Sequence, residues 1–184
     1  MAPHGRARAA VAAFALGIAI MFTCSALLHL RGWSLATYER LLRLDHTGIY
    51  LAIGGTGLAL GLLGLDGWPR RILVAGAAIG MAIGIVVEWL PFAAPRGFNQ
   101  AVYLSFGWVP LVLLPWLWQT SGVLVVVLLG IGGVFYTSGA IIVAMRRPDP
   151  LPHWFGYHEI FHVLVIAAVV SHGAMLAVLV ERSG

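Results

Sequence analysis

Two histidines near the end of the chain are spaced as metal ligands. Residues 158–162 read His-Glu-Ile-Phe-His, which fits the pattern H-E-x-x-H. In metalloproteases with this pattern, two histidines one helical turn apart bind Zn²⁺ and the glutamate acts as the base. The residues that follow are mostly apolar to about position 179, a run long enough to cross a membrane. The motif therefore raises two alternatives, a protease site or a different metal site in a membrane helix.

Three other polar residues are predicted to lie at the same membrane face as this histidine pair. His29 ends the first apolar stretch of the chain, and Asp45 begins the second. Ser25 precedes His29 by four residues, which places both side chains on one face of a helix. Because successive spans alternate in direction, the end of the first span and the starts of the second and the last share one face. Ionisable residues in spans are costly and are functional candidates, so we expect one shared site.

The chemistry predicted for this site is that of a catalytic zinc ion. His29, His158 and His162 would supply three imidazole ligands and leave the fourth tetrahedral position open for water. Zinc can lower the pKa of such a water to about 7. Asp45 is suited to accept a proton from this water or to orient a histidine, and Ser25 could hydrogen-bond to the water or to an oxyanion. Without a metal, the alternatives are a hydrogen-bonded histidine pair and an interfacial His29.

The protease alternative fails because of where its residues lie. Intramembrane metalloproteases pair such a helix with an aspartate in a Leu-Asp-Gly stretch, and residues 65–67 have this sequence. That turn is predicted at the opposite membrane face, about 30 Å away, whereas zinc–ligand bonds are about 2 Å long. Glu159 is rotated by about 100° from His158 on a helix. We therefore expect Glu159 to be the least important residue of the motif.

Three more ionisable residues are interpreted structurally. His172 lies about 15 Å further along the last helix than His162 and is predicted to bond to a neighbouring helix. His46 points about 100° away from Asp45 and is predicted to be structural or interfacial. For Glu88, near the end of the third apolar stretch, we favour a side chain that reaches the headgroups over one that borders the site.

The elements that must position these residues are membrane-spanning helices. Of the 184 residues, 60% are hydrophobic and only 10% are charged, whereas soluble domains carry about 25% charged residues. The mean hydropathy is +0.93. We predict an all-α, polytopic membrane bundle that forms a single transmembrane domain over residues 1–184. Its six predicted spans cover about 9–30, 44–65, 72–91, 100–118, 122–145 and 155–179.

Charge and cysteine content limit the possible partners. All eleven basic residues are arginines, and the net charge is +4, which fits loops that meet lipid headgroups better than a nucleic-acid surface. The alternating spans place five arginines on one side and six on the other, so charge alone does not set the orientation. The single cysteine, Cys24, excludes an internal disulfide.

The first apolar stretch follows Arg6 and Arg8 as in a signal peptide, but its length and its lack of a cleavage site predict a retained span.

The residues of the site also carry a family resemblance. The combination of Ser25-x-x-x-His29, Leu44-Asp45 and His158-x-x-x-His162 resembles the hemolysin III family, the bacterial branch of the progestin and adipoQ receptors. The resemblance runs over nearly the whole chain. In the adiponectin receptors of that superfamily, three matching histidines bind zinc and the aspartate holds a water. The resemblance thus implies that His29, His158 and His162 are ligands and that Asp45 and Ser25 attend the water.

The resemblance also implies a function and a location. Alkaline ceramidases in the wider superfamily imply hydrolysis of lipid amides or esters, with membrane lipids as surroundings and substrate. The alternative is a non-enzymatic sensor or receptor, or a pore-forming cytolytic protein, with a structural zinc; the oligomeric state stays open. The implied location is the bacterial inner membrane, with the site near the cytoplasmic face. Two departures stand out: the family has seven spans, one of which would precede residue 9, and residues 56–59 replace its T-Y-T-P stretch.

Overall fold

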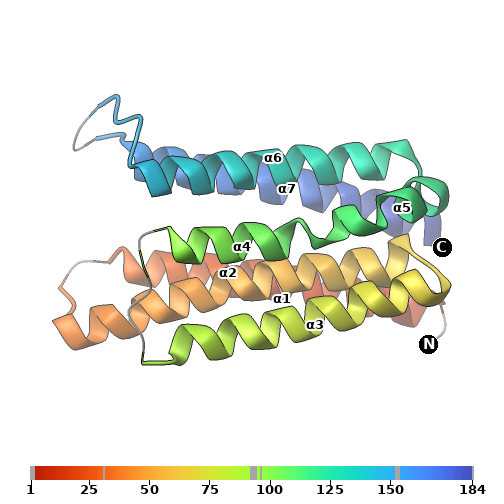
Figure 1. The fold of residues 1–184 in the computed structure, drawn as a ribbon, viewed down its shortest axis with the longest axis horizontal. Helices are drawn as coiled ribbons and strands as arrows, with labels where there is room; N and C mark the ends of the chain where they lie inside the picture. The colour runs from red at the N-terminus through yellow and green to blue at the C-terminus, as the bar shows by residue number, and fades with distance from the viewer. Residues whose placement is uncertain (1–2, 31, 92–94, 96, 152–153, 184) are drawn as a thin grey trace. The chain divides into compact units, whose positions relative to one another are not determined.

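The computed structural model describes residues 3–30, 32–91, 95, 97–151 and 154–183, and this part of the chain is helical, with no named strand. The all-α prediction is confirmed. The helices group into two compact units, the first made of α1 to α3 and the second of α4 to α7 (Figure 1). The elements are α1 (Pro3–Leu28), α2 (Leu35–Gly64), α3 (Gly67–Trp89), α4 (Phe98–Gly107), a 3₁₀ helix η1 (Val109–Leu113), α5 (Leu114–Ser121), α6 (Val123–Met145) and α7 (Tyr157–Ser183).

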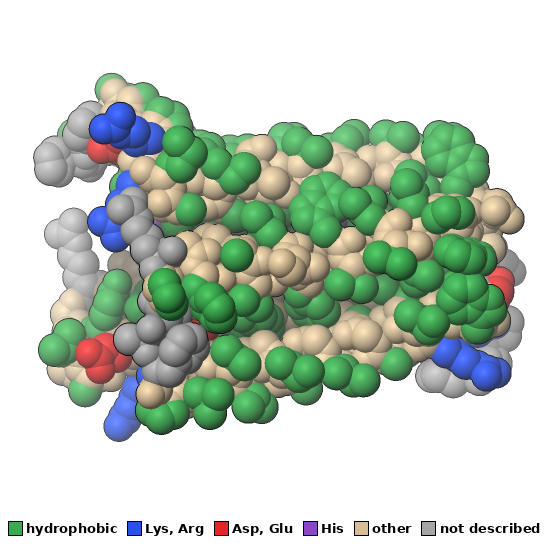
Figure 2. All heavy atoms as spheres, in the orientation of Figure 1, with side chains coloured by type: hydrophobic (Ala, Val, Ile, Leu, Met, Phe, Trp, Pro, Cys, Tyr) green, Lys and Arg blue, Asp and Glu red, His purple; other side chains and the backbone are tan. Residues whose placement is uncertain are grey.

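Six helices in the described residues are long and apolar enough to cross a membrane, as predicted. Many large apolar side chains on them are exposed, including Ile79, Val112 and Val170. Figure 2 shows hydrophobic side chains along the length of the helices, whereas arginine and acidic side chains gather at the helix ends. Exposed apolar surface of this extent requires lipid rather than water around it. The chain is therefore an integral membrane protein.

The second helix begins nine residues earlier than the predicted span, at Leu35 instead of residue 44. Ser34 caps its start, because the Ser34 hydroxyl oxygen accepts a hydrogen bond from the Thr37 backbone N–H at 3.3 Å. The predicted span omits these nine residues because Glu39, Arg40 and Arg43 interrupt the apolar residues there. Asp45 consequently lies well inside α2 rather than at its first turn.

The fourth predicted span is a broken helix. The stretch Phe98–Ser121 has the length and composition of one span, but it consists of α4, η1 and α5. Pro110 lies in the first turn of η1 and Pro115 in the first turn of α5. Proline has no N–H to donate within a helix, so each one starts a new segment. Trp108, at the break, donates a hydrogen bond from Nε1 to Thr137 Oγ1 on α6 at 3.0 Å.

In the first unit, α2 packs against both α1 and α3. Gly48 allows α1 to come close, since a Cβ at this position would lie 2.7 Å from Met21 Cα. Towards α3, the ring of Tyr50 occupies the space that a side chain at Gly84 would need, and Tyr50 is only 2% exposed. These two glycines therefore allow α1 and α3 to pack closely against α2.

In the second unit, hydrogen bonds between side chains of α7 and the backbone of α6 join the two helices. The Ser171 hydroxyl donates to Leu128 O at 2.8 Å, and His172 Nε2 donates to Leu129 O at 3.3 Å. The His172 ring fills the space beside Gly132, and the residue is 6% exposed. The prediction that His172 bonds to a neighbouring helix is confirmed.

Candidate metal centre

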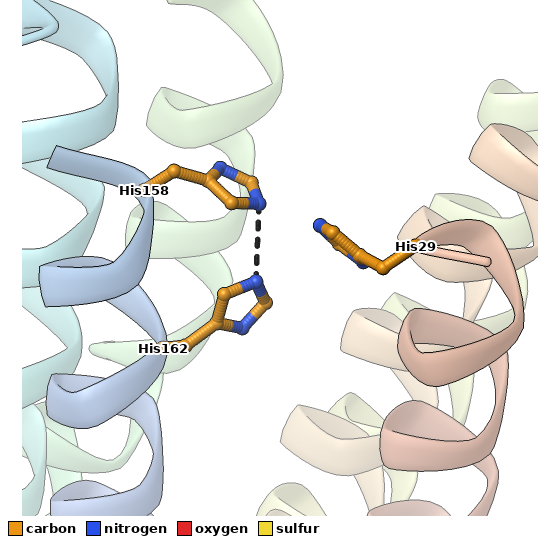
Figure 3. Close-up of side chains that lie close together, drawn as sticks. All are labelled: His29, His158 and His162. Carbon is orange, nitrogen blue, oxygen red and sulfur yellow. Dashed lines mark hydrogen bonds between the residues drawn. The ribbon is translucent and has the colours of Figure 1, made fainter. Parts of the chain in front are cut away.

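His158 and His162 face each other on the first two turns of α7. Their Nε2 atoms are 3.0 Å apart, and their rings are nearly perpendicular, with an interplanar angle of 84° and centroids 4.6 Å apart. Figure 3 shows both rings projecting from the same side of the helix, with the contact dashed. Both residues are half-buried. The i, i+4 spacing thus directs two ring nitrogens to one point, as the sequence predicts.

The separation of the two nitrogens fits a shared metal ion. Two imidazole nitrogens on a tetrahedral zinc, each about 2.0–2.1 Å from the ion, lie about 3.3 Å apart. The observed separation of 3.0 Å needs only a few tenths of an ångström of adjustment. Without a metal, one Nε2 must carry a proton and donate it to the other, so the two rings would be different tautomers. Both the metal pair and the hydrogen-bonded pair are consistent with this geometry.

The start of α7 holds this pair in place. The Gly156 backbone N–H donates to Glu159 Oε2 at 2.8 Å, the contact that a glutamate three residues into a helix makes with the residue before it. Glu159 therefore caps the helix that carries the histidines. Phe161 packs against Gly139 of α6, and its ring also contacts His162, with centroids 5.4 Å apart. The motif's glutamate thus has a structural partner, and its phenylalanine anchors the helix.

His29 follows the last residue of α1 and is exposed. Its Nδ1 donates to the backbone oxygen of Ser25 at 2.7 Å. This contact assigns the proton to Nδ1 and the ring lone pair to Nε2, the arrangement common in metal-binding histidines. His29 thus offers one ring nitrogen as a possible metal ligand in the first unit, as His158 and His162 do in the second. The backbone oxygen of Ser25 orients His29, a role that the sequence did not suggest for this residue.

Asp45 lies on a turn of α2 that is tied to the end of α3. Arg43 donates hydrogen bonds to the backbone oxygens of Glu88 and Leu90 at 2.9 and 3.3 Å. His46 Nδ1 pairs with Glu88 Oε1 at 2.9 Å, and Trp89 Nε1 donates to the Thr47 hydroxyl at 3.1 Å. We call this set, Arg43, His46 and Thr47 with residues 88–90, the α2–α3 clamp.

The clamp determines where Asp45 points. With about 100° of rotation per residue, Arg43, His46 and Thr47 lie within about 100° of one another, on the side that faces α3. Asp45 is rotated by about 200° from Arg43 and so lies on the side away from α3. On that side, Asp45 is close enough to Cys24 of α1 for the carboxylate and the thiol to interact electrostatically. The clamp therefore turns Asp45 towards the end of α1 that carries Ser25 and His29.

The interpretation of Glu88 as a headgroup-reaching side chain is wrong. Its side chain is only 10% exposed and is paired with His46, which is 24% exposed. The pair joins residues 42 positions apart, so spacing along the chain gave no sign of it. The sequence signal that could have indicated this pair is that His46, near the start of the second span, and Glu88, near the end of the third, are both ionisable and lie at similar depths. The structural interpretation of His46 is confirmed.

Replacing Glu88 with alanine is expected to destabilise the first unit by about 1–3 kcal/mol, the usual cost of removing a hydrogen bond to a charged group and leaving its partner unsatisfied. The measurement is thermal unfolding of the purified protein in detergent, followed by tryptophan fluorescence. Glu39→Ala is the control, because Glu39 is exposed on the same helix that the clamp holds; its effect is expected within about 0.5 kcal/mol. Equal unfolding temperatures for both variants would contradict the clamp.

Comparison with known proteins identifies the family. A family model described as Haemolysin-III related matches residues 1–173. The chain belongs to the haemolysin-III related family. The matched range includes the five residues predicted for the site: Ser25, His29, Asp45, His158 and His162.

Two relatives of this haemolysin-III related chain come from distant organisms. Hemolysin-3 from Bacillus cereus is 30% identical over 169 residues, which cover 89% of this chain and 72% of the relative. An adiponectin receptor protein from Drosophila melanogaster is 30% identical over 151 residues, which cover 71% of this chain. The match spans only 33% of that receptor's length. These similarities agree with the resemblance to the progestin and adipoQ receptor superfamily.

Proposed function

We propose that this protein is a zinc-dependent hydrolase of lipid amides or esters in the bacterial inner membrane, with its site near the cytoplasmic face. The observation that carries the proposal is the His158–His162 pair, whose Nε2 atoms lie 3.0 Å apart at the start of a span. His29 would be the third ligand, with Nε2 as its ligand atom because Nδ1 is bonded to Ser25 O. Three histidine ligands leave one position for chemistry, whereas structural zinc sites use four protein ligands.

A bound zinc ion would supply a Lewis acid that lowers the pKa of water to about 7 and polarises a carbonyl group. Asp45 would accept the proton from the attacking water and pass it to the leaving group, the role of a general acid and base. The α2–α3 clamp supports this role by directing Asp45 away from α3. The Ser25 hydroxyl would hydrogen-bond the water or the developing oxyanion.

The membrane setting supports a lipid as the substrate. All three candidate ligands lie within one or two turns of a span end, where the amide and ester groups of lipids are located. A substrate held in the bilayer needs its acyl chains accommodated by lipid and apolar helix surfaces rather than by a closed pocket. The protein's own task would then be limited to the polar carbonyl region of the lipid.

Removal of the metal is expected to abolish hydrolysis, by at least about 100-fold, since a Lewis acid supplies several kcal/mol to such a reaction. The assay measures fatty acid released from a ceramide and from a diacyl phospholipid by purified protein in nanodiscs. 1,10-Phenanthroline should stop the release, and Zn²⁺ but not Mg²⁺ should restore it. A protein that binds zinc but releases no fatty acid from either lipid would contradict the enzyme proposal.

A non-enzymatic role is the second candidate, and the names of the relatives favour it. One relative is named for hemolysis and the other as a receptor, and neither name describes an enzyme. In that case zinc would tie α1 to α7 and the protein would act as a sensor, receptor or pore. The hydrolysis assay separates the two candidates, whereas zinc content does not, because both bind the metal.

A further inference from the structure

A polar cavity lies within the second unit, where α4 begins, α6 ends and α7 begins. Its volume is about 310 Å³, at the lower end of the range for small-molecule sites. Asn99 and Gln100 line it from α4, Arg146 from the end of α6, and Tyr157 and His158 from α7. A cavity at the ends of three spans is at the depth of the lipid headgroups.

The lining has the charge and the donors that an oxyanion needs. Arg146 is the one charged residue among the described residues that line the cavity, and no hydrogen bond or ion pair of its guanidinium with another described residue is found. The side-chain amides of Asn99 and Gln100 can donate further hydrogen bonds. Two carboxylates lie beside Gly156: Glu159 accepts a hydrogen bond from the Gly156 N–H, and Asp149 Oδ1 occupies the space that a side chain at Gly156 would need. Neither residue lines the cavity. Arginine with neutral donors is a combination suited to phosphate.

The backbone of Arg146 is unusual for an arginine. It has φ 53° and ψ 39°, in the left-handed region. The backbone N–H of Arg146 bonds to Val143 O, and that of Arg147 bonds to Ile142 O, both at 3.3 Å. These two bonds form the helix-ending motif in which glycine usually occupies the position of Arg146. An arginine held where glycine is favoured points to a use for its side chain.

We propose that this cavity binds the phosphate group of an anionic lipid headgroup, with Arg146 as its main electrostatic contact and Asn99 and Gln100 as donors. The site goes beyond the proposed hydrolysis because phosphate binding here requires no metal. Its position beside His158 means that a lipid held by its phosphate would have its glycerol and acyl linkages near the histidine pair. The same phosphate chemistry could be met by free inorganic phosphate, so the test includes both.

The variant Arg146→Gly tests the proposal without harming the fold, because glycine adopts the left-handed conformation more readily than arginine. The experiment measures binding of dioctanoyl phosphatidic acid to the full-length protein in non-ionic detergent by native mass spectrometry, with and without EDTA. Arg146→Gly is expected to weaken binding about 10-fold or more, the typical effect of losing a charge-assisted hydrogen bond. Its unfolding temperature should not fall, and wild-type binding should persist in EDTA.

Arg147→Gln is the matched control, since it removes the neighbouring arginine, which does not line the cavity. Equal weakening by both variants would overturn the site and indicate general attraction to a basic membrane face. Equal affinity of the wild type for dioctanoyl phosphatidylcholine, unaffected by Arg146→Gly, would overturn it as well. If inorganic phosphate displaces the lipid at millimolar concentration, the cavity is an oxyanion site whose ligand is free phosphate. If it does not, the ligand is the phosphate of the lipid headgroup. Loss of zinc or of hydrolysis has no bearing on these outcomes.

Discussion

Replacing His29 with alanine is expected to lower the affinity of the protein for zinc by at least about 100-fold. Loss of a residue that merely supports a metal ligand already costs about 10–100-fold, and the loss of one of three ligands should cost more. His158 and His162 would remain as a pair, which is fewer protein ligands than catalytic zinc sites have. The measurement is zinc per chain by elemental analysis, after dialysis against a series of chelators of known affinity.

His4→Ala is the control for this experiment, because it removes an imidazole from the opposite end of the same helix. It should leave the zinc content unchanged. His29→Cys provides a second check, since a thiolate is also a zinc ligand and should restore part of the affinity if His29 contacts the metal. Full zinc retention in His29→Ala would contradict a three-histidine site. Zinc loss in both His29→Ala and His29→Cys, together with a lowered unfolding temperature, would indicate a structural role for His29 instead.

The spans could be predicted from the sequence because one physical requirement dominates them. A helix in lipid must be apolar over about 20 residues, and that signal is read directly from composition. The start of α2 could not be predicted in this way, because a polar segment outside the lipid has the same low hydropathy whether it is helical or a loop. The position of this helix start is set by the Ser34 side chain, which accepts a hydrogen bond from the Thr37 backbone N–H. The break within Phe98–Ser121 was foreshadowed by its two prolines, but which residues start a new helical segment depends on packing against α6.

For the candidate site, the sequence predicted a contact within one helix but not the contacts between helices. The i, i+4 spacing within one helix was enough to bring His158 and His162 together, because helix geometry fixes that relation. The His46–Glu88 pair was not predictable in the same way, since it depends on how α2 and α3 are rotated about their axes. From the sequence Arg146 is one of eleven arginines with nothing to single it out, because its left-handed backbone and its cavity exist only once α4, α6 and α7 are packed.

Replacing Asp45 with asparagine is expected to reduce lipid hydrolysis by about 10²–10⁴-fold, the usual contribution of a general acid or base, while zinc binding stays close to that of the wild type. Asparagine has nearly the same shape, so the packing of α2 and the clamp should be preserved. The loss would therefore be in the rate of turnover rather than in folding or in metal affinity. Fatty acid release and zinc content are measured on the same preparation.

Glu159→Gln is the variant that separates this proposal from the metalloprotease interpretation of the H-E-x-x-H motif. In that interpretation Glu159 is the base, so its amide variant should lose turnover as strongly as Asp45→Asn. If Glu159 instead caps α7 through the Gly156 N–H, glutamine keeps an oxygen that can accept the same bond, and hydrolysis should stay within a few-fold of the wild type. Full activity in Asp45→Asn would contradict the role of Asp45. Matched losses in both variants would mean that the histidine helix also carries the base.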